Sequence, residues 1–183
     1  KIMEKSIKGT RTEQNLLKAF AGESQARNKY TFYAAQAEKD GYKQISNIFT
    51  ETANNERTHA QLWFTALQGG AIKSTPDNLA AAAEGERYEW TTMYAEFAKT
   101  AREEGFTDIA RLFEQVGDIE NAHERRFVKL LENIERGTVF SGSETSVWIC
   151  LNCGFVYSGK QPPQKCPVCG KPQAYFQLKV EDY

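Results

Sequence analysis

Apolar residues recur every three or four positions along residues 12–136, which is the spacing of one face of an α-helix. Ala, Glu, Lys, Gln and Leu are common in this region, and Pro76 is its only proline. Glycines, which tend to end helices, divide the region into segments. The sequence therefore predicts four helices, at residues 12–39, 42–68, 75–105 and 107–136.

The pattern changes after Gly137. Residues 137–146 include Ser-Gly-Ser and are typical of a flexible connection, and from Val147 onward the chain is rich in Cys, Gly, Pro and aromatic residues. This composition is typical of a small domain of loops and short strands. We therefore predict a helical domain at residues 1–140 and a small C-terminal domain at residues 145–183.

The helical region repeats itself with an offset of 64 residues. Upstream of Tyr30 the register slips by one, so that Glu23 corresponds to Glu86. Two helical hairpins that bury matching faces predict an all-α four-helix bundle with approximate two-fold symmetry. The matching pairs include Tyr30 and Tyr94, Gly41 and Gly105, Ile45 and Ile109, Phe49 and Phe113, Glu56 and Glu120, and His59 and His123.

Each repeat carries a Glu-x-x-His motif on its apolar stripe. The stripe leads into Glu56 and His59 in the second predicted helix, and into Glu120 and His123 in the fourth. Residues three apart share one face of a helix, so each pair is close enough to share a metal ion inside the bundle. The first and third helices add three inward carboxylates, namely Glu23, Glu86 and Glu89.

A single Glu-x-x-His motif is usually a surface pair or a core histidine, but this one occurs twice at equivalent positions and uses the only two histidines of the chain. Five buried carboxylates also need cations to neutralise them. One Glu from each of two helices and Glu-x-x-His from each of the other two form the ligand set of di-iron carboxylate bundles. Zinc and manganese are alternatives, although mixed carboxylate and imidazole ligation favours iron.

Tyr30 and Tyr94 lie at equivalent positions near these ligands. Their hydroxyl groups can donate hydrogen bonds to the ligand carboxylates. The alternative is that the two rings simply pack in the core. The sequence favours neither role over the other.

Two Cys-x-x-Cys motifs follow, formed by Cys150 with Cys153 and by Cys166 with Cys169. Their spacing predicts a tetrahedral site with four thiolate ligands. Zinc ribbons use similar spacing, so spacing leaves both zinc and iron open. Nearby aromatic residues suit the apolar shell of a one-electron iron site, but any domain this small needs them for its core.

Composition limits the classes of function. Hydrophobic residues make up 40% and charged residues 26% of the 183 residues, which is ordinary for a soluble globular protein. A net charge of −1 without a basic run argues against nucleic acid or anionic membranes as partners. No segment is apolar enough to span a membrane, and residues 1–12 are too polar for a signal peptide, so we predict a cytoplasmic location.

The motifs together resemble the rubrerythrin family across nearly the whole chain. The resemblance implies a ferritin-like bundle, a rubredoxin-like module that binds iron, and a peroxidase that reduces hydrogen peroxide to water in oxidative-stress defence. It also implies that electrons come from NAD(P)H through separate reductases and carriers such as rubredoxin, and no dinucleotide-binding fingerprint occurs in the chain. The motifs are Ala-Phe-Ala-Gly-Glu23-Ser-Gln-Ala-Arg, Glu56-Arg-Thr-His59, Gly85-Glu86-Arg-Tyr-Glu89 and Glu120-Asn-Ala-His123, followed by the four-cysteine module.

The same resemblance implies a role for each ligand. Glu56 and Glu120 would bridge two irons, together with an oxo group in the oxidised state. Glu23 and Glu89 would bind one iron, and Glu86 and His123 the other. One iron of this family exchanges a carboxylate for a histidine as its redox state changes, and by position these are Glu89 and His59. A third iron would be held by Cys150, Cys153, Cys166 and Cys169 and would return electrons to the di-iron site.

The connection between the second and third helices constrains assembly. The second helix would be about 39 Å long, whereas residues 69–74 reach at most about 20 Å. We hypothesise a domain-swapped dimer, in which the third and fourth helices dock into the bundle of a second chain. Early fraying of the second helix or a late start of the third is the alternative. The resemblance implies a homodimer or higher homo-oligomer in either case.

Two other functions remain open. Ferroxidase or iron-storage proteins share the bundle, although storage does not need an attached electron donor. A non-catalytic electron carrier, or an interaction module stabilised by zinc, would carry the same ligands without redox turnover.

Overall fold

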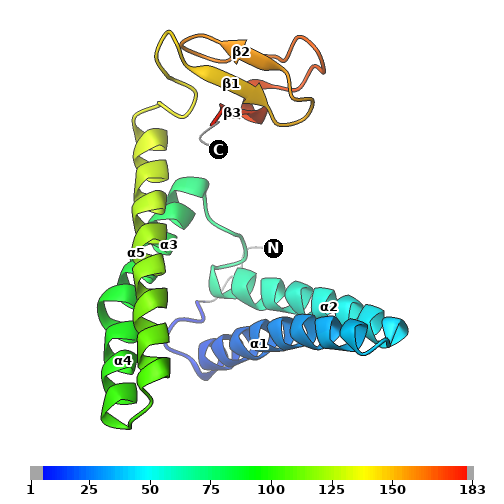
Figure 1. Cartoon of the computed structure of the whole chain (residues 1–183), viewed down its shortest axis with the longest axis vertical. Helices are drawn as coiled ribbons and strands as arrows, with labels where there is room; N and C mark the ends of the chain where they lie inside the picture. Colours follow the sequence, from blue (N-terminus) through cyan, green and yellow to red (C-terminus); the bar gives the residue numbers. More distant parts are fainter. Residues whose placement is uncertain (1–5, 181–183) are drawn as a thin grey trace. The chain divides into compact units, whose positions relative to one another are not determined.

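The computed structural model describes residues 6–180 and divides the chain into two compact units, residues 1–73 and residues 74–183. The first unit is a helical hairpin, and the second contains another helical hairpin followed by a small sheet (Figure 1). In the part of the chain that is described, no helix has the length and apolar character of a membrane span.

The first hairpin consists of α1 (Arg11–Lys39) and α2 (Lys43–Leu67), which pack side by side (Figure 1). The Thr10 hydroxyl caps α1 by accepting a hydrogen bond from the Glu13 amide at 3.1 Å. Gly41 makes the turn with a φ of 86°, a conformation that residues with a side chain rarely adopt. Between the helices only small residues are buried, namely Ala34, Ala37, Ser46, Ala53 and Ala60.

The second hairpin consists of α3 (Thr75–Tyr88), the π-helical turn η1 (Glu89–Met93), α4 (Tyr94–Glu103) and α5 (Thr107–Glu135). Its inner surface again buries small residues, namely Ala83, Ala98, Ala101, Ala110 and Gly117. The predicted helix at residues 75–105 is present, but a π-turn that the sequence analysis did not predict lies within it. The other three predicted helices are confirmed to within one residue at each end.

The π-turn explains the slip in the sequence repeat. Glu23 and Tyr30 are separated by seven positions, whereas their counterparts Glu86 and Tyr94 are separated by eight. The additional residue falls in the segment that contains η1, and a π-turn is the form in which a helix accommodates one extra residue. The insertion keeps Tyr94 in phase with the rest of its helix.

Each hairpin leaves its large apolar residues uncovered on the face that carries the Glu-x-x-His motif. Ile48 is 54% exposed in the first hairpin, and its repeat counterpart Leu112 is 59% exposed in the second. Small residues between two helices and large ones on an outer face are typical of a hairpin that forms half of a larger bundle.

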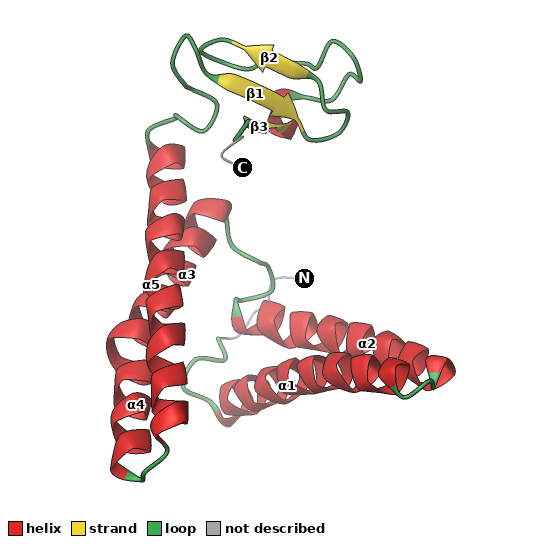
Figure 2. Cartoon of the chain, viewed as in Figure 1, coloured by secondary structure: helices red, strands yellow, loops and turns green. Residues whose placement is uncertain are grey.

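The C-terminal module is a three-stranded antiparallel sheet with the order β2-β1-β3 (Figure 2). Its strands are β1 (Val147–Cys150), β2 (Val156–Ser158) and β3 (Phe176–Leu178), and the short helix η2 (Gln173–Tyr175) precedes β3. Trp148 is buried at the centre of the core with Cys150, Cys166 and Phe176, and its indole N–H donates to the Gly159 carbonyl at 2.9 Å. This confirms the predicted small domain of loops and strands.

Candidate metal centres

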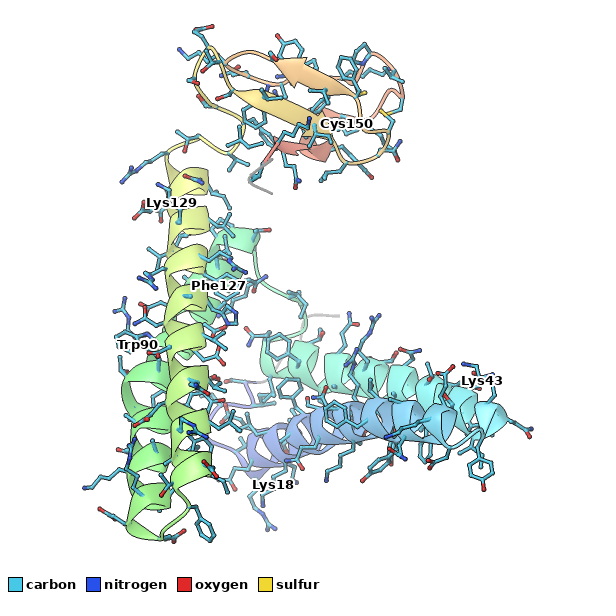
Figure 3. The ribbon with its side chains drawn as sticks, in the orientation of Figure 1. Lys18, Lys43, Trp90, Phe127, Lys129 and Cys150 are labelled. Atoms are coloured by element: carbon cyan, nitrogen blue, oxygen red, sulfur yellow. The ribbon has the colours of Figure 1, made fainter. Side chains whose placement is uncertain are left out.

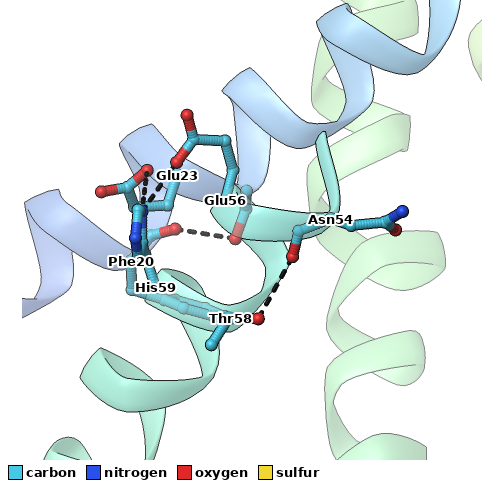
Figure 4. Close-up of polar contacts among 7 residues, drawn as sticks. Phe20, Glu23, Asn54, Glu56, Thr58 and His59 are labelled. Carbon is cyan, nitrogen blue, oxygen red and sulfur yellow. Dashed lines mark hydrogen bonds and ion pairs between the residues drawn. The ribbon is translucent and has the colours of Figure 1, made fainter. Parts of the chain in front are cut away.

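The first hairpin brings three potential ligands together from two helices. Glu23 lies on α1, and Glu56 and His59 lie one turn apart on α2 (Figure 4). The Nδ1 atom of His59 is 2.8 Å from Glu56 Oε2 and 3.8 Å from Glu23 Oε2. One donor atom from each residue lies within 4.8 Å of the other two, so all three can reach one ion or a closely spaced pair.

The second hairpin reproduces this arrangement with Glu86 on α3 and with Glu120 and His123 on α5. The Nδ1 atom of His123 is 2.6 Å from Glu120 Oε2 and 3.8 Å from Glu86 Oε1. The corresponding distances in the two hairpins agree within 0.2 Å (2.8 against 2.6 Å, and 3.8 Å in both). The sequence repeat therefore extends to the geometry of the ligands.

Crowding of negative charge marks the second group as a cation site. The pKa of Glu86 is raised, first by desolvation and then by a hydrogen bond to Glu120 and by repulsion from that carboxylate. A carboxyl group with a raised pKa is destabilised as an anion, and a nearby cation removes that penalty. The donor set of carboxylates and imidazole suits iron.

Glu89 is the one predicted ligand that lies outside these two groups. The charge of Glu89 nevertheless contributes to the raised pKa of Tyr94. Desolvation is the largest cause of that rise, followed by the charges of Glu89, Glu120 and Glu86. The role of Glu89 as a ligand stays a prediction.

The two tyrosines pack in equivalent ways. The rings of Tyr30 and Phe49 lie 6.0 Å apart at 36°, and those of Tyr94 and Phe113 have the same separation and angle. Among the hydrogen bonds of residues 6–180, none joins either tyrosine to a ligand carboxylate. Both rings thus pack against a phenylalanine of the same hairpin, and a hydrogen bond from their hydroxyl groups to the ligands stays a prediction.

The four cysteines converge at one end of the C-terminal module, with all sulfur atoms within 4.8 Å of one another. The Cys150–Cys169 and Cys153–Cys166 Sγ distances are both 3.7 Å. Four sulfurs placed about 2.3 Å from a central metal form a tetrahedron with edges of about 3.8 Å. The cluster therefore has the dimensions of a tetrahedral metal site.

Backbone amides shape the two cysteine turns. The amides of Gly154 and Gly170 donate to the carbonyls of Cys150 and Cys166 at 2.9 Å and close each Cys-x-x-Cys turn. The backbone N–H of Lys171 lowers the pKa of Cys169 to about 6 by donating to its sulfur. Despite a hydrogen bond from the Phe155 backbone, burial and hydrogen bonds with the other three thiols raise the pKa of Cys153 to about 12. Cys169 is thus the thiol of this pair that ionises readily, and a bound metal would ionise its neighbour.

Sequence reasoning missed one buried acid, Glu124. Its carboxylate accepts hydrogen bonds from Arg87 Nε at 2.7 Å and from Trp90 Nε1 at 2.5 Å. These donors lower the pKa of Glu124, the indole hydrogen bond most and then that of the guanidinium. The available signal was its position in the helical repeat, where the first hairpin has the buried Ala60.

Two hairpins that each present two carboxylates and an imidazole, followed by a four-cysteine module, define a class of non-haem iron proteins with a ferritin-like domain and a rubredoxin-like domain. The family model described as rubrerythrin matches residues 14–131, and the model for the rubredoxin-like domain of rubrerythrin matches residues 148–177. The chain belongs to the rubrerythrin family.

Its relatives match along nearly their whole length. Rubrerythrin of Porphyromonas gingivalis is 49% identical, with 99% of this chain and 96% of that protein covered. Rubrerythrin of Nitratidesulfovibrio vulgaris is 48% identical over 95% of this chain and 97% of that protein. A solved structure of nigerythrin in a mixed-valence state is 29% identical over 96% of this chain and 89% of that chain, with a TM-score of 0.36.

Membership of this family resolves the choice of metal that the sequence left open. The helical domain holds a di-iron site and the four cysteines hold a single iron. Both assignments fit the donor sets, because hard carboxylates with imidazole and a tetrahedron of thiolates are both established iron environments.

Proposed function

We propose that this protein is a peroxidase that reduces hydrogen peroxide to two molecules of water, with two electrons and two protons, in defence against oxidative stress. The family consists of oxidoreductases. The observation that carries the proposal is the combination in one chain of paired Glu/His ligand groups and an attached four-cysteine electron carrier. Storage of iron does not need such a carrier.

The side chains have separate tasks in this proposal. Iron supplies the reversible one-electron chemistry that side chains lack. Glu56 and Glu120 would contribute a ligand to both irons, Glu23 and Glu89 would hold one of them, and Glu86 and His123 would hold the other. His59 would serve as the alternative ligand to Glu89.

Charge on the C-terminal module supports an acidic protein as the electron donor. Residues 145–183 contain four lysines, at positions 160, 165, 171 and 179, and two acidic residues, Glu181 and Asp182, so the module has a net positive charge. Two of them, Lys165 and Lys171, flank the second Cys-x-x-Cys turn, and Val168 in that turn is 68% exposed. An exposed apolar tip between cations favours a small acidic carrier, such as a rubredoxin, which a separate NAD(P)H-dependent reductase supplies with electrons.

Replacing Lys165 and Lys171 together by Gln tests this donor. Reduction of the four-cysteine iron by an acidic carrier should slow several-fold at low salt, and the difference from wild type should vanish at high salt. Stopped-flow absorbance measures the rate, and Lys18→Gln with Lys99→Gln is the matched control on the helices. An equal slowing in the control would contradict a docking role for the module.

We further propose that the active form is a domain-swapped homodimer. At about 1.5 Å per residue, the 25 residues of α2 are about 37 Å long. The connection from Gln68 to Ser74 reaches about 25 Å at most, which is too short to return along α2. The proposal pairs Glu23, Glu56 and His59 of one chain with Glu86, Glu89, Glu120 and His123 of the other.

Complementation distinguishes swapped from unswapped dimers. Chains carrying Glu56→Gln and chains carrying Glu120→Gln are each expected to be inactive, and they are co-refolded in equal amounts. In a swapped dimer, each mixed pair contains one doubly altered site and one intact site. Half of the dimers are mixed and half of their sites are intact, so about a quarter of the activity should return. No recovery despite demonstrated mixed dimers would rule out the swap.

The peroxidase proposal itself is tested under anaerobic conditions. The iron-loaded protein is fully reduced and mixed rapidly with stoichiometric hydrogen peroxide while visible absorbance is recorded. Fast oxidation of the di-iron site, then of the four-cysteine iron, with a much slower reaction toward oxygen is the expected result. Slow reaction with peroxide and rapid reaction with oxygen would instead indicate a ferroxidase. The cytoplasmic location is part of the same proposal.

A further inference from the structure

The two hairpins differ at one buried position beside their histidines. His123 is followed by Glu124, which is 7% exposed, and His59 is followed by Ala60, which is also 7% exposed. Both positions lie on the inner surface between the helices of their own hairpin. A buried carboxylate occurs there in one repeat and a methyl group in the other.

The Glu124 carboxylate is fully engaged by donors from the opposite side of the hairpin. Arg87 of α3 donates to Oε1 at 2.7 Å, and Trp90 of η1 donates to Oε2 at 2.5 Å. Hydrogen bonds to a charged group are stronger than those between neutral groups. The carboxylate therefore ties α5 to α3 and to the π-turn, in the hairpin where Figure 3 labels Trp90.

Each member of this trio is next in sequence to a predicted ligand. Arg87 follows Glu86, Trp90 follows Glu89, and Glu124 follows His123. Successive residues of a helix point in directions about 100° apart, so the trio lies to one side of the ligands and holds the same stretches of backbone. None of the three is itself within the group of ligand atoms.

The π-turn and the trio occur in the same repeat. The residue inserted between Glu86 and Tyr94 is accommodated by the π-turn, and Trp90 lies within that turn. In the first hairpin α1 is uninterrupted, and at the position of Glu124 there is no acceptor. The π-turn that interrupts the repeat thus places the Trp90 indole where it can donate a hydrogen bond to the buried Glu124 carboxylate.

We propose that Glu124, Arg87 and Trp90 form a positioning clamp that fixes the backbone beside Glu86 and His123, so that the iron these two ligands would hold is held more rigidly than the other iron of the pair. This inference rests on the di-iron assignment and deepens the proposed function. His59 of the first hairpin has Ala60 beside it and no such clamp. The three residues act through the backbone that they tie together.

The clamp predicts two rates of iron release. A ferrous chelator added to the reduced protein under anaerobic conditions should remove one iron of the di-iron pair quickly and the other slowly. Trp90→Phe deletes the indole N–H and keeps the ring, so the slow phase should accelerate by about 10-fold or more. Arg87→Lys should have a smaller effect, because one hydrogen bond can be retained. The visible absorbance of the four-cysteine iron should not change.

The control is Glu114→Gln, which breaks an exposed ion pair with Arg102 on the same hairpin away from the ligands. It should leave both phases unchanged. Mössbauer spectra of the di-iron site should show a broadened signal for one iron in Trp90→Phe and for neither iron in the control. Two equal phases in the wild type, or an unaltered slow phase in folded Trp90→Phe, would overturn the clamp. Since neither readout requires turnover, a failure of the peroxidase proposal would be recognised separately.

Discussion

The two helical hairpins share their ligand geometry but not the structure around it. Glu56 with His59 and Glu120 with His123 have nearly the same spacing, and Tyr30 lies at the same separation and angle to Phe49 as Tyr94 does to Phe113. Beside these matching groups the second hairpin has a π-turn and a buried carboxylate, and farther along its helices it has an exposed ion pair. The comparison teaches that ligand positions in a repeat can remain fixed while the supports of each half diverge.

The largest expected effect is on the reaction with peroxide. It comes from neutralising Glu56 or Glu120, the carboxylates at equivalent positions of the two hairpins. Glu56→Gln and Glu120→Gln should each lower peroxide-dependent oxidation of the reduced protein by a factor on the order of 100, because a neutral amide is a poor bridging ligand. Stopped-flow absorbance with iron analysis measures the loss. A large loss of the reaction in one variant and none in the other would contradict equivalent roles for Glu56 and Glu120.

An intermediate effect is expected from making the second hairpin more like the first. Gly117 corresponds to Ala53, and a Cβ atom added at Gly117 would lie 3.5 Å from Tyr94 Cβ, an ordinary contact distance. Gly117→Ala should raise the free energy of unfolding by about 0.5–1 kcal/mol, since glycine is a poor helix former. Urea denaturation measures the change, and a decrease would show that the helices cannot accept the methyl group.

The smallest effect is expected from the ion pair of Arg102 with Glu114, which has no counterpart at the equivalent positions of the first hairpin. Arg102 Nη2 donates to Glu114 Oε2 at 2.8 Å, and this hydrogen bond lowers the pKa of Glu114. A lowered pKa stabilises the fold above the ordinary pKa of glutamate, and the contribution is lost as the pH falls through the lowered value.

Glu114→Gln should therefore reduce stability slightly at neutral pH and not at all in acid, with a dependence on salt because both groups are exposed. Thermal unfolding at pH 7 and at pH 3 gives the comparison. A deficit of equal size at both pH values would mean that the side chain contributes through packing and not through its charge.

The sequence was sufficient for the elements and the ligand groups. Apolar periodicity and the glycines at 41 and 105 defined the hairpins, and the doubled Glu-x-x-His motif identified both groups of ligands. These features are local in the sequence, so they predict the helices without knowledge of the tertiary contacts.

The support of the second group was not predictable in the same way. The slip in register near Tyr30 was visible, but a one-residue insertion is equally compatible with a loop or a π-turn. Glu124 precedes Arg125 and Arg126, and a charged run of this kind is usually solvated. Its burial depends on donors more than 30 residues away, at Arg87 and Trp90, which only the folded hairpin brings near.

The division of ligands between two hairpins also affects the order in which the protein is made. A growing chain completes Glu23, Glu56 and His59 before the second hairpin has left the ribosome. We expect three ligands on an uncovered face to bind a metal weakly. In the proposed dimer, iron that arrives early would exchange until the second hairpin docks, and retained iron would report that every helix is in place.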